Sequence, residues 1–260
     1  MPQAGAMAQS SSLPSAVDHQ RWQGRRIGIT GAQGALGQAL SRRFQAQGAH
    51  VVGLTHREPP CNAASATTAS QSWVQWHCGR EQELAPVLAQ LDLLVLNHGI
   101  NPGADQRSLT LNRALEVNAL SSWRLLEHYE RIAAELPPGS EPREVWVNTS
   151  EAEIQPALSP AYELSKRLLG QLVSLRWSEH QRSPIPTLRL RKLVLGPFRS
   201  ELNPIGVMSA DWVAGQVILQ AGLGLPLVIV TPNPLTYLLM PLSELGRAAY
   251  NRLISNRPDR

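Results

Sequence analysis

Short β-rich runs and longer helical patterns alternate along most of this sequence. The strand-like runs lie at 25–30, 50–55, 73–77, 92–97, 144–149, 187–196 and 226–231. Helical patterns lie between them, at about 34–47, 81–90, 108–135, 160–180 and 207–221. This alternation predicts the α/β class, with a doubly wound, mostly parallel sheet and helices on both of its faces. Such sheets bind ligands at the carboxyl ends of their strands, so we expect the functional residues there.

The length of the chain and the distribution of its charges narrow the range of functions. With 260 residues, of which 43% are hydrophobic, the chain is long enough for one large α/β domain. We expect this domain at 21–260, after a flexible tail at 1–20. The net charge is +4, but the basic residues are spread along the chain, which argues against nucleic-acid binding. Cys61 and Cys78 have no metal-binding or redox spacing, and the first twenty residues resemble no secretory signal, so we expect a cytoplasmic protein without a cysteine-based metal site.

The C-terminal part of the chain raises the question of membrane contact. From Trp212 to Ser243 there is no charged residue, but glycines and prolines interrupt the segment. A packed helix followed by a buried strand is therefore favoured over a membrane-spanning helix. The stretch at 234–254 mixes apolar runs with Arg247 and Arg252. Such a stretch can pack on its own domain or on a subunit partner, or it can lie on a membrane surface and admit a lipophilic substrate.

A glycine-rich turn follows the first predicted strand. It reads Thr-Gly-Ala-Gln-Gly-Ala-Leu-Gly from Thr30 to Gly37 and opens the first predicted helix. Glycines let the backbone approach a pyrophosphate, and the amides and dipole at a helix N-terminus then bind its charge. We expect contacts with a dinucleotide cofactor from Gly31, Gln33, Gly34, Ala35, Leu36 and Gly37.

The end of the second predicted strand carries information on the cofactor. The chain reads Thr55-His56-Arg57 here, where a site for NAD(H) usually places an acidic residue that binds the ribose 2′-hydroxyl. With the carboxylate absent and a guanidinium available, His56 and Arg57 favour the 2′-phosphate of NADP(H). NAD(H) remains an alternative, since Thr55 can also bind the ribose hydroxyls.

Tyr162 and Lys166 are the pair of residues that most specifically indicates a catalytic function. They lie four residues apart, on one face of a helix that Ser159 can cap and Pro160 can open. Lys166 is one of only two lysines in the chain. A nearby ammonium favours the phenolate, so we expect Lys166 to lower the pKa of Tyr162 and make it an acid and base for a carbonyl or an alcohol. Ser150, at the end of the fifth predicted strand, is placed to hold the substrate oxygen.

Together these motifs resemble the short-chain dehydrogenases/reductases, in their shorter, single-domain branch. The resemblance covers about residues 25–200. It rests on the glycine turn, on Leu-Asn-His-Gly at 96–99, on Asn118, Ser150 and Tyr162-x-x-x-Lys166, and on Gly196-Pro197 after the sixth strand. It implies a Rossmann-like fold, with Asn97, Gly99, Gly196 and Pro197 also near the cofactor.

The resemblance also implies a role for each catalytic residue. Tyr162 would be the acid and base, Lys166 would bind the nicotinamide ribose and tune Tyr162, Ser150 would position the carbonyl, and Asn118 would hold a water that relays protons through Lys166. We expect an NADP(H)-dependent oxidoreductase, in a homo-oligomer, that interconverts a small-molecule carbonyl and a secondary alcohol. The pocket would lie between the loop at about 199–208 and the C-terminal segment.

Some features depart from the pattern of the single-domain branch. The middle glycine falls at Gly34 rather than at Leu36, as in the longer branch that acts on sugar nucleotides. Cys78-Gly79 replaces an acidic residue after the third strand, and the spacing from Ser150 to Tyr162 is one residue short. Two alternatives therefore stay open: a sugar-nucleotide epimerase or dehydratase, for whose substrate domain little chain remains after Lys166, and a dinucleotide sensor without turnover.

Overall fold

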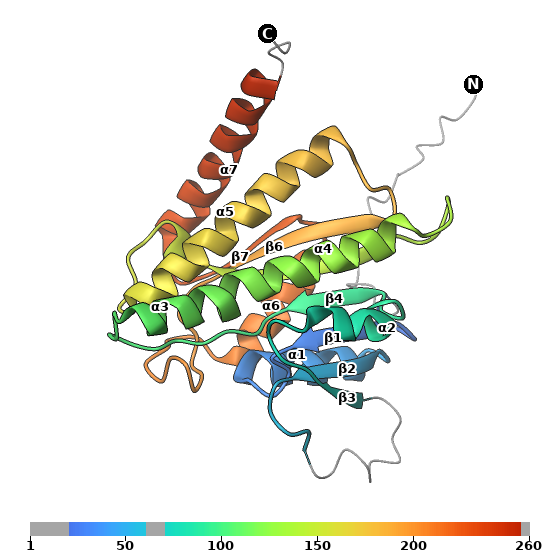
Figure 1. Cartoon of the computed structure of the whole chain (residues 1–260), viewed down its shortest axis with the longest axis horizontal. Helices are drawn as coiled ribbons and strands as arrows, with labels where there is room; N and C mark the ends of the chain where they lie inside the picture. The colour runs from blue at the N-terminus through green and yellow to red at the C-terminus, as the bar shows by residue number, and fades with distance from the viewer. Residues whose placement is uncertain (1–20, 61–70, 256–260) are drawn as a thin grey trace, which may run out of the picture.

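The computed structural model describes residues 21–60 and 71–255, and it shows one parallel sheet with helices on both faces (Figure 1). The seven strands lie in the order β3-β2-β1-β4-β5-β6-β7, and each pairs in parallel with its neighbours. The predicted doubly wound sheet is thus confirmed. The tail predicted at 1–20 lies outside the described residues. The strands are β1 (Arg26–Thr30), β2 (His50–Thr55), β3 (Gln71–Gln75), β4 (Leu93–Leu96), β5 (Arg143–Ser150), β6 (Leu188–Leu195) and β7 (Leu227–Val230).

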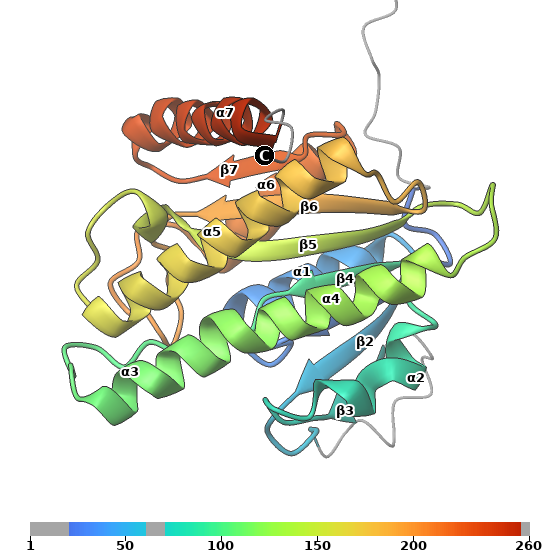
Figure 2. The same ribbon diagram turned by 45° about the horizontal axis from the view of Figure 1, so that its top comes forward.

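The helices form two layers. On one face of the sheet lie α1 (Ala35–Ala46) and α6 (Ala210–Gly222), and on the other lie α2 (Ala85–Leu88), α4 (Ser121–Ala134) and α5 (Pro160–Arg182) (Figure 2). The short helix α3 (Ser108–Leu115) leads into α4 through a π-helical turn at Glu116–Leu120. The last helix, α7 (Pro234–Ser255), lies beyond β7 and runs away from the sheet toward its C-terminal end (Figure 1).

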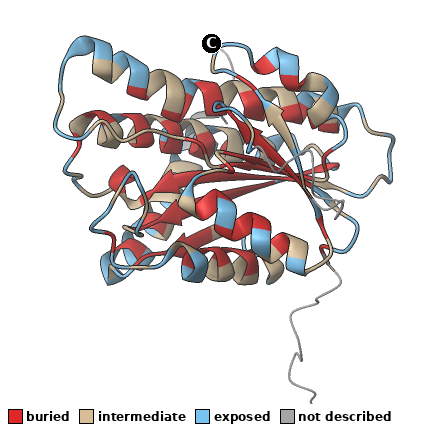
Figure 3. Cartoon of the chain, turned by 90° about the horizontal axis from the view of Figure 1, so that it is seen from below, coloured by how far each residue is buried: buried red, intermediate tan, exposed pale blue. Residues whose placement is uncertain are grey.

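The core explains why these strands read as nearly continuous apolar runs. Figure 3 shows the sheet buried between the two helical layers, whose outer sides are exposed. β4 is buried along its whole length because helices cover both of its faces. On the α1 and α6 side, Trp22 packs edge to face against Phe44 and Trp146, with ring centroids 5.0 Å and 5.6 Å apart.

The structure shifts several of the predicted boundaries. β3 lies at Gln71–Gln75, two residues before the predicted run at 73–77. The helix predicted at 81–90 is a 3-10 turn followed by the four residues of α2, and the one predicted at 108–135 is divided by the π turn. α6 begins at Ala210, where the side chain of Ser209 caps it, rather than at 207. The sequence did not predict a helix at Pro234–Ser255, where Pro241 lies inside the helix.

The strand order indicates which edge of the sheet binds ligands. β1 pairs with β2 on one side and with β4 on the other, so the chain reverses direction across the sheet between β1 and β4. Ligands bind at such a switch point, beyond the carboxyl ends of the strands. The segments after β1, β4, β5 and β6 all begin at this edge, as the sequence predicted.

Candidate active site

The glycine turn after β1 brings the backbone close to the end of β4. Gly31 has a φ of +65°, and a Cβ added to it would lie 3.0 Å from the Cα of His98. A Cβ on Gly37 would lie 2.4 Å from the carbonyl oxygen of Gly31, so only glycine fits there. Within the described chain, no side chain caps α1 at Gly34, and its first turn holds no acidic residue. The backbone amides at this helix N-terminus therefore suit a pyrophosphate.

Thr30 joins the ends of β1 and β4. Its buried Oγ1 donates to the carbonyl oxygen of Val95 at 3.2 Å and accepts from the amides of Asn97 at 2.8 Å and His98 at 3.2 Å. The ring of His98 contacts the same oxygen through Nδ1 at 2.9 Å. Burial lowers the pKa of His98 to about 3, so its ring is neutral at physiological pH. Sequence reasoning did not single out Thr30, and its place as the last residue of the strand was the only available signal.

Asn97, Gly99 and Asn118 lie together beyond β4. Asn97 Oδ1 accepts a hydrogen bond of 2.8 Å from Asn148 on β5. A Cβ on Gly99 would lie 3.0 Å from Asn118 Oδ1. Asn118 is fully buried on the π turn, a feature often found at functional sites. Its side chain bonds to the amide and the carbonyl of Ile100 at 2.7 Å and 2.9 Å, and its Nδ2 also donates to Ser165 Oγ at 2.8 Å.

Helix α5 starts as the sequence predicts and carries Tyr162 and Lys166 into the site. Ser159 caps the helix by accepting from the amide of Tyr162 at 3.4 Å, and Pro160 occupies the first turn. Lys166 is 5% exposed, and its Nζ donates to the carbonyl oxygen of Asn148 at 3.0 Å. The same Nζ lies 5.9 Å from the centre of the Tyr162 ring. The helix thus holds the phenol and the ammonium side by side, next to the end of β5.

The ionisation of this pair differs from the expectation. Burial raises the pKa of Tyr162, although hydrogen bonding to Ser150 lowers it in part. The pKa decrease expected from Lys166 is therefore not found in this structure. Burial also lowers the pKa of Lys166, to about 8, while the charge of Glu153 acts in the opposite direction. At neutral pH Tyr162 is accordingly a neutral phenol, which is the form that donates a proton.

Ser150 ends β5 beside this pair. Its Oγ hydrogen-bonds with Tyr162 and also accepts from the amide of Ala152 at 3.2 Å. The second contact opens a 3-10 turn at Glu151–Glu153. The structure therefore brings together Ser150, Tyr162 and Lys166, and Asn118 is linked to the same helix through Ser165. Gly196 and Pro197 lie at the base of the loop after β6, where a Cβ on Gly196 would meet Thr231 Oγ1 at 2.4 Å.

Thr55, His56 and Arg57 form a separate corner at the end of β2. Thr55 is buried, and its Oγ1 accepts from the amide of Arg57 at 3.1 Å, whereas His56 and Arg57 are exposed. Arg57 forms an ion pair of 3.4 Å with Glu201, from the loop after β6. Both side chains are more than half exposed, so this pair is weak. No sequence pattern indicated this contact, because Glu201 lies 144 residues away from Arg57.

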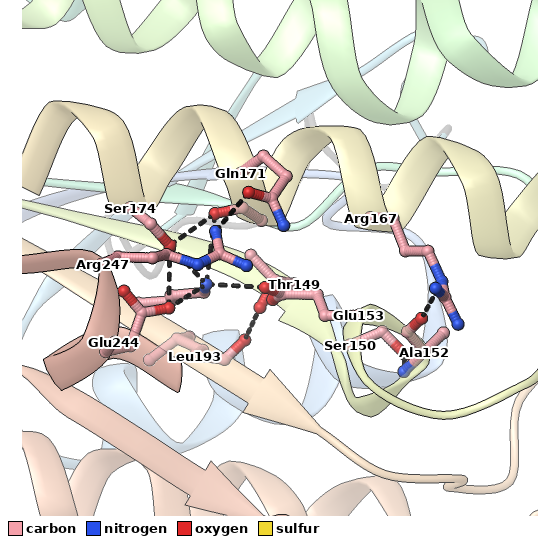
Figure 4. A network of polar contacts seen from close by, with 12 residues as sticks. Thr149, Ser150, Ala152, Glu153, Arg167, Gln171, Ser174, Leu193, Glu244 and Arg247 are labelled. Carbon is pink, nitrogen blue, oxygen red and sulfur yellow. Dashed lines mark hydrogen bonds and ion pairs between the residues drawn. The ribbon is translucent and has the colours of Figure 1, made fainter. Parts of the chain in front are cut away.

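A cluster of charged side chains includes Glu153, on the turn that follows Ser150, and sequence reasoning missed it. Lys192 on β6 is fully buried, and its Nζ donates to Glu153 at 2.6 Å, to Glu244 of α7 at 2.8 Å and to Ser174 at 3.1 Å. It also donates to the carbonyl oxygen of Gly170 at 3.2 Å. Figure 4 shows the side chains of Glu153, Ser174 and Glu244 pointing toward one another. The only available signal was that Lys192 is the second of two lysines.

Fold and site together define a nicotinamide-dinucleotide enzyme of the short-chain dehydrogenase/reductase type. The family model "NAD dependent epimerase/dehydratase family" matches residues 27–210, and the chain belongs to this family. The monoglucosyldiacylglycerol epimerase of Synechocystis sp. (strain ATCC 27184 / PCC 6803 / Kazusa) is 40% identical over 236 residues, which are 90% of this chain and 56% of that protein. The chain thus spans little more than half the length of this relative.

Solved structures share the fold at low sequence identity. A short-chain dehydrogenase from Burkholderia cenocepacia J2315 in complex with NADP superposes with a TM-score of 0.69 at 16% identity, over 89% of this chain and 98% of that one. The aldohexose dehydrogenase of Thermoplasma acidophilum gives a TM-score of 0.65 at 14% identity, over 82% and 94% of the two chains. Among residues 21–60 and 71–255, no helix is long and apolar enough to cross a membrane.

Proposed function

We propose that this chain catalyses hydride transfer between NADP(H) and a secondary alcohol or its ketone, with Tyr162 as the acid and base. One observation carries the proposal: a neutral, half-buried Tyr162 hydrogen-bonds with Ser150, while the Lys166 ammonium lies 5.9 Å from the centre of the Tyr162 ring. A carbonyl oxygen placed between the two hydroxyl groups would accept a hydrogen bond from each of them.

The roles of the individual side chains follow from their contacts. In the reductive direction Tyr162 donates its proton to the substrate oxygen, and in the oxidative direction it takes that proton back. Ser150 holds the oxygen in place. Lys166 is fixed by the carbonyl of Asn148 and has further donor hydrogens for a ribose hydroxyl, and Asn118 keeps the segment after β4 against α5. When bound, the nicotinamide supplies the hydride donor or acceptor.

NADP(H) is the proposed cofactor. The glycine turn folds so tightly that a Cβ on Gly31 or Gly37 would crowd the protein's own backbone, and no described side chain caps the helix N-terminus that follows it. This leaves backbone amides available for a pyrophosphate. Arg57 at the end of β2 is exposed and held only by a weak pair with Glu201, so its guanidinium is available for a 2′-phosphate.

A second candidate, epimerisation of a glycolipid sugar, is favoured by one specific observation. The relative named as a monoglucosyldiacylglycerol epimerase is 40% identical across 90% of this chain. Such a reaction can use the same two half-reactions: the alcohol is oxidised to a ketone, and the ketone is then reduced on its other face. The cofactor returns to its starting state, so no net change in NADP(H) accompanies turnover.

Tyr162→Phe tests the proposal because it removes the proton donor and keeps the ring. We expect turnover to fall by about a hundredfold or more, with the NADPH dissociation constant unchanged. Tyr250→Phe, at a tyrosine that is 64% exposed on α7, is the matched control and should retain full activity. A Tyr162→Phe enzyme with activity within about threefold of the parent would show that Tyr162 is not the acid and base.

The substrate panel separates the two candidates. Simple ketones and sugar alcohols are assayed for net formation or loss of reduced nicotinamide. Monoglucosyldiacylglycerol is incubated with a catalytic amount of NADP⁺, and the sugar configuration is followed by nuclear magnetic resonance. Epimer formation without net reduction of the cofactor supports epimerisation, whereas net reduction or oxidation supports a dehydrogenase.

A further inference from the structure

Helix α7 turns a row of leucines away from the rest of the domain. Their spacing of three to eight residues places them on one side of the helix, while Thr236 and Met240 on the opposite side are buried. We call this row the leucine face. Its members and their exposed fractions are Leu235 (57%), Leu238 (58%), Leu242 (55%), Leu245 (67%) and Leu253 (75%).

No described segment covers the leucine face. α7 lies outside β7 at the end of the sheet, and in both ribbon views its outer side is turned to the surroundings (Figures 1 and 2). Four exposed leucines in successive turns, from Leu235 to Leu245, form an apolar strip, and large exposed apolar patches mark interaction sites.

The charges on α7 indicate which partner fits. Of the described side chains on this helix, only Glu244 is acidic, and it is turned inward to Lys192 at 2.8 Å. Arg247 and Arg252 lie on the side of the helix toward α5, where they hydrogen-bond to the neutral side chains of Gln171 and Gln181, and no ion pair with a described carboxylate offsets their charge. An apolar face flanked by two guanidinium groups, on a helix with no outward carboxylate among its described side chains, is complementary to an anionic lipid surface.

The first turn of α7 is bonded directly to the segment that follows Ser150. Gln155 Nε2 donates to Thr236 Oγ1 at 2.8 Å, and Asn233 Nδ2 donates to Gln155 Oε1 at 2.7 Å. Three residues beyond Gln155, Leu158 is 88% exposed. A lipid or protein surface that contacts the start of the leucine face would therefore lie next to the segment between Ser150 and Tyr162. We call this the substrate side of the site, because Ser150 and Tyr162 are the proposed contacts of the substrate oxygen.

We propose that the leucine face docks this protein on an anionic lipid bilayer, with α7 lying along the surface and the substrate side of the site beside the lipid headgroups. A second copy of the chain fits less well. The alternating three- and four-residue spacing of a coiled-coil seam reaches only Leu245, and the next positions are Ala249 and Arg252. The inference rests on the proposed function for its substrate, a lipid-linked sugar, but the docking itself is independent of turnover.

The test is sedimentation of the full chain with vesicles of phosphatidylcholine and phosphatidylglycerol. The parent should sediment with the vesicles, and Leu238→Gln/Leu242→Gln should lower its partition coefficient by at least about tenfold. The control Leu223→Gln/Leu225→Gln changes two leucines that are 68% and 42% exposed in the segment between α6 and β7, and it should sediment like the parent. Thermal unfolding and NADPH binding verify that each variant is folded.

Three outcomes would overturn the docking proposal. One is a parent that stays in the supernatant, and another is an equal loss of binding in the two double variants. The third is a parent that forms a dimer which Leu238→Gln/Leu242→Gln dissociates, without vesicle binding, since the leucine face would then bind a second copy. Vesicle binding by a parent that is inactive on every alcohol and ketone would support docking and refute the proposed function, so the two failures are distinguishable.

Discussion

The two halves of the ligand-binding edge are built in different ways. The half beyond β1 and β4 is formed by glycines and backbone groups, with Thr30 linking the strand ends through uncharged hydrogen bonds. The half beyond β5 and β6 rests on the charges of Lys192, Glu153 and Glu244, which join β6, the turn after β5 and α7. The first half is thus fixed by local backbone geometry, and the second by contacts between distant parts of the chain.

The charged half has a specific energetic consequence. Taking an ammonium and two carboxylates out of water is costly, and the cost is offset only while every group keeps its partners. The three hydrogens of the Lys192 ammonium are shared among four acceptors, on Glu153, Glu244, Ser174 and the carbonyl of Gly170. Removing one member therefore leaves uncompensated buried charge, whereas the glycine half holds no such group among its described residues.

The largest expected effect follows from Lys192→Met. We expect the free energy of unfolding to fall by about 3–5 kcal/mol, because two carboxylates lose a buried cation. Thermal unfolding should show a decrease in midpoint of roughly 6–20 °C for a chain of this size. The control is Glu141→Gln, which breaks an ion pair of Arg25 with a carboxylate that is 73% exposed, and it should cost less than about 1 kcal/mol.

The same variant tests the division into two halves. Since the Lys192 cluster lies on the β5 and β6 side, Lys192→Met should lower turnover while the NADPH dissociation constant of the folded protein stays within about threefold of the parent value. A dissociation constant that rises as much as turnover falls would show that the two halves are one coupled unit.

The comparison also explains how much the sequence could predict. The parallel, doubly wound sheet, the glycine turn, the start of α5 at Pro160 and the placement of Tyr162 and Lys166 on one helix face follow from local patterns, and the sequence analysis predicted them. Lys192 and Glu244 are 52 residues apart, and no local pattern joins them. Pro241 argued against a helix at 234–255, although tertiary contacts with α5 and β7 hold α7 in place. The raised pKa of Tyr162 depends on burial, which sequence spacing does not reveal.

Lys166 lies between the two halves, and its ionisation predicts a pH profile. Burial lowers its pKa to about 8, so the ammonium is lost as pH rises through this value. We expect kcat/KM for reduction to fall by about tenfold per pH unit above pH 8, and Lys166→Arg, which keeps its charge, should shift this decline to higher pH. The unfolded chain binds this proton up to about pH 10.4, so the contribution of Lys166 to stability increases with pH between the two values. A kcat/KM that stays constant above pH 8 would show that the reaction does not require the Lys166 ammonium.

The smallest expected effect concerns the cofactor half, at Arg57. A charge-assisted contact with the 2′-phosphate is worth about 1.5–3 kcal/mol, so the parent should bind NADPH about ten- to a hundredfold more tightly than NADH. Arg57→Ala should narrow this ratio and leave NADH binding nearly unchanged. Glu201→Gln should raise NADPH affinity by a few-fold, because the weak pair of 3.4 Å no longer competes with the phosphate. Isothermal titration of both cofactors with the parent and the two variants measures these changes. Equal affinities of the parent for NADPH and NADH would refute the NADP(H) preference, because the exposed guanidinium would then play no part in binding.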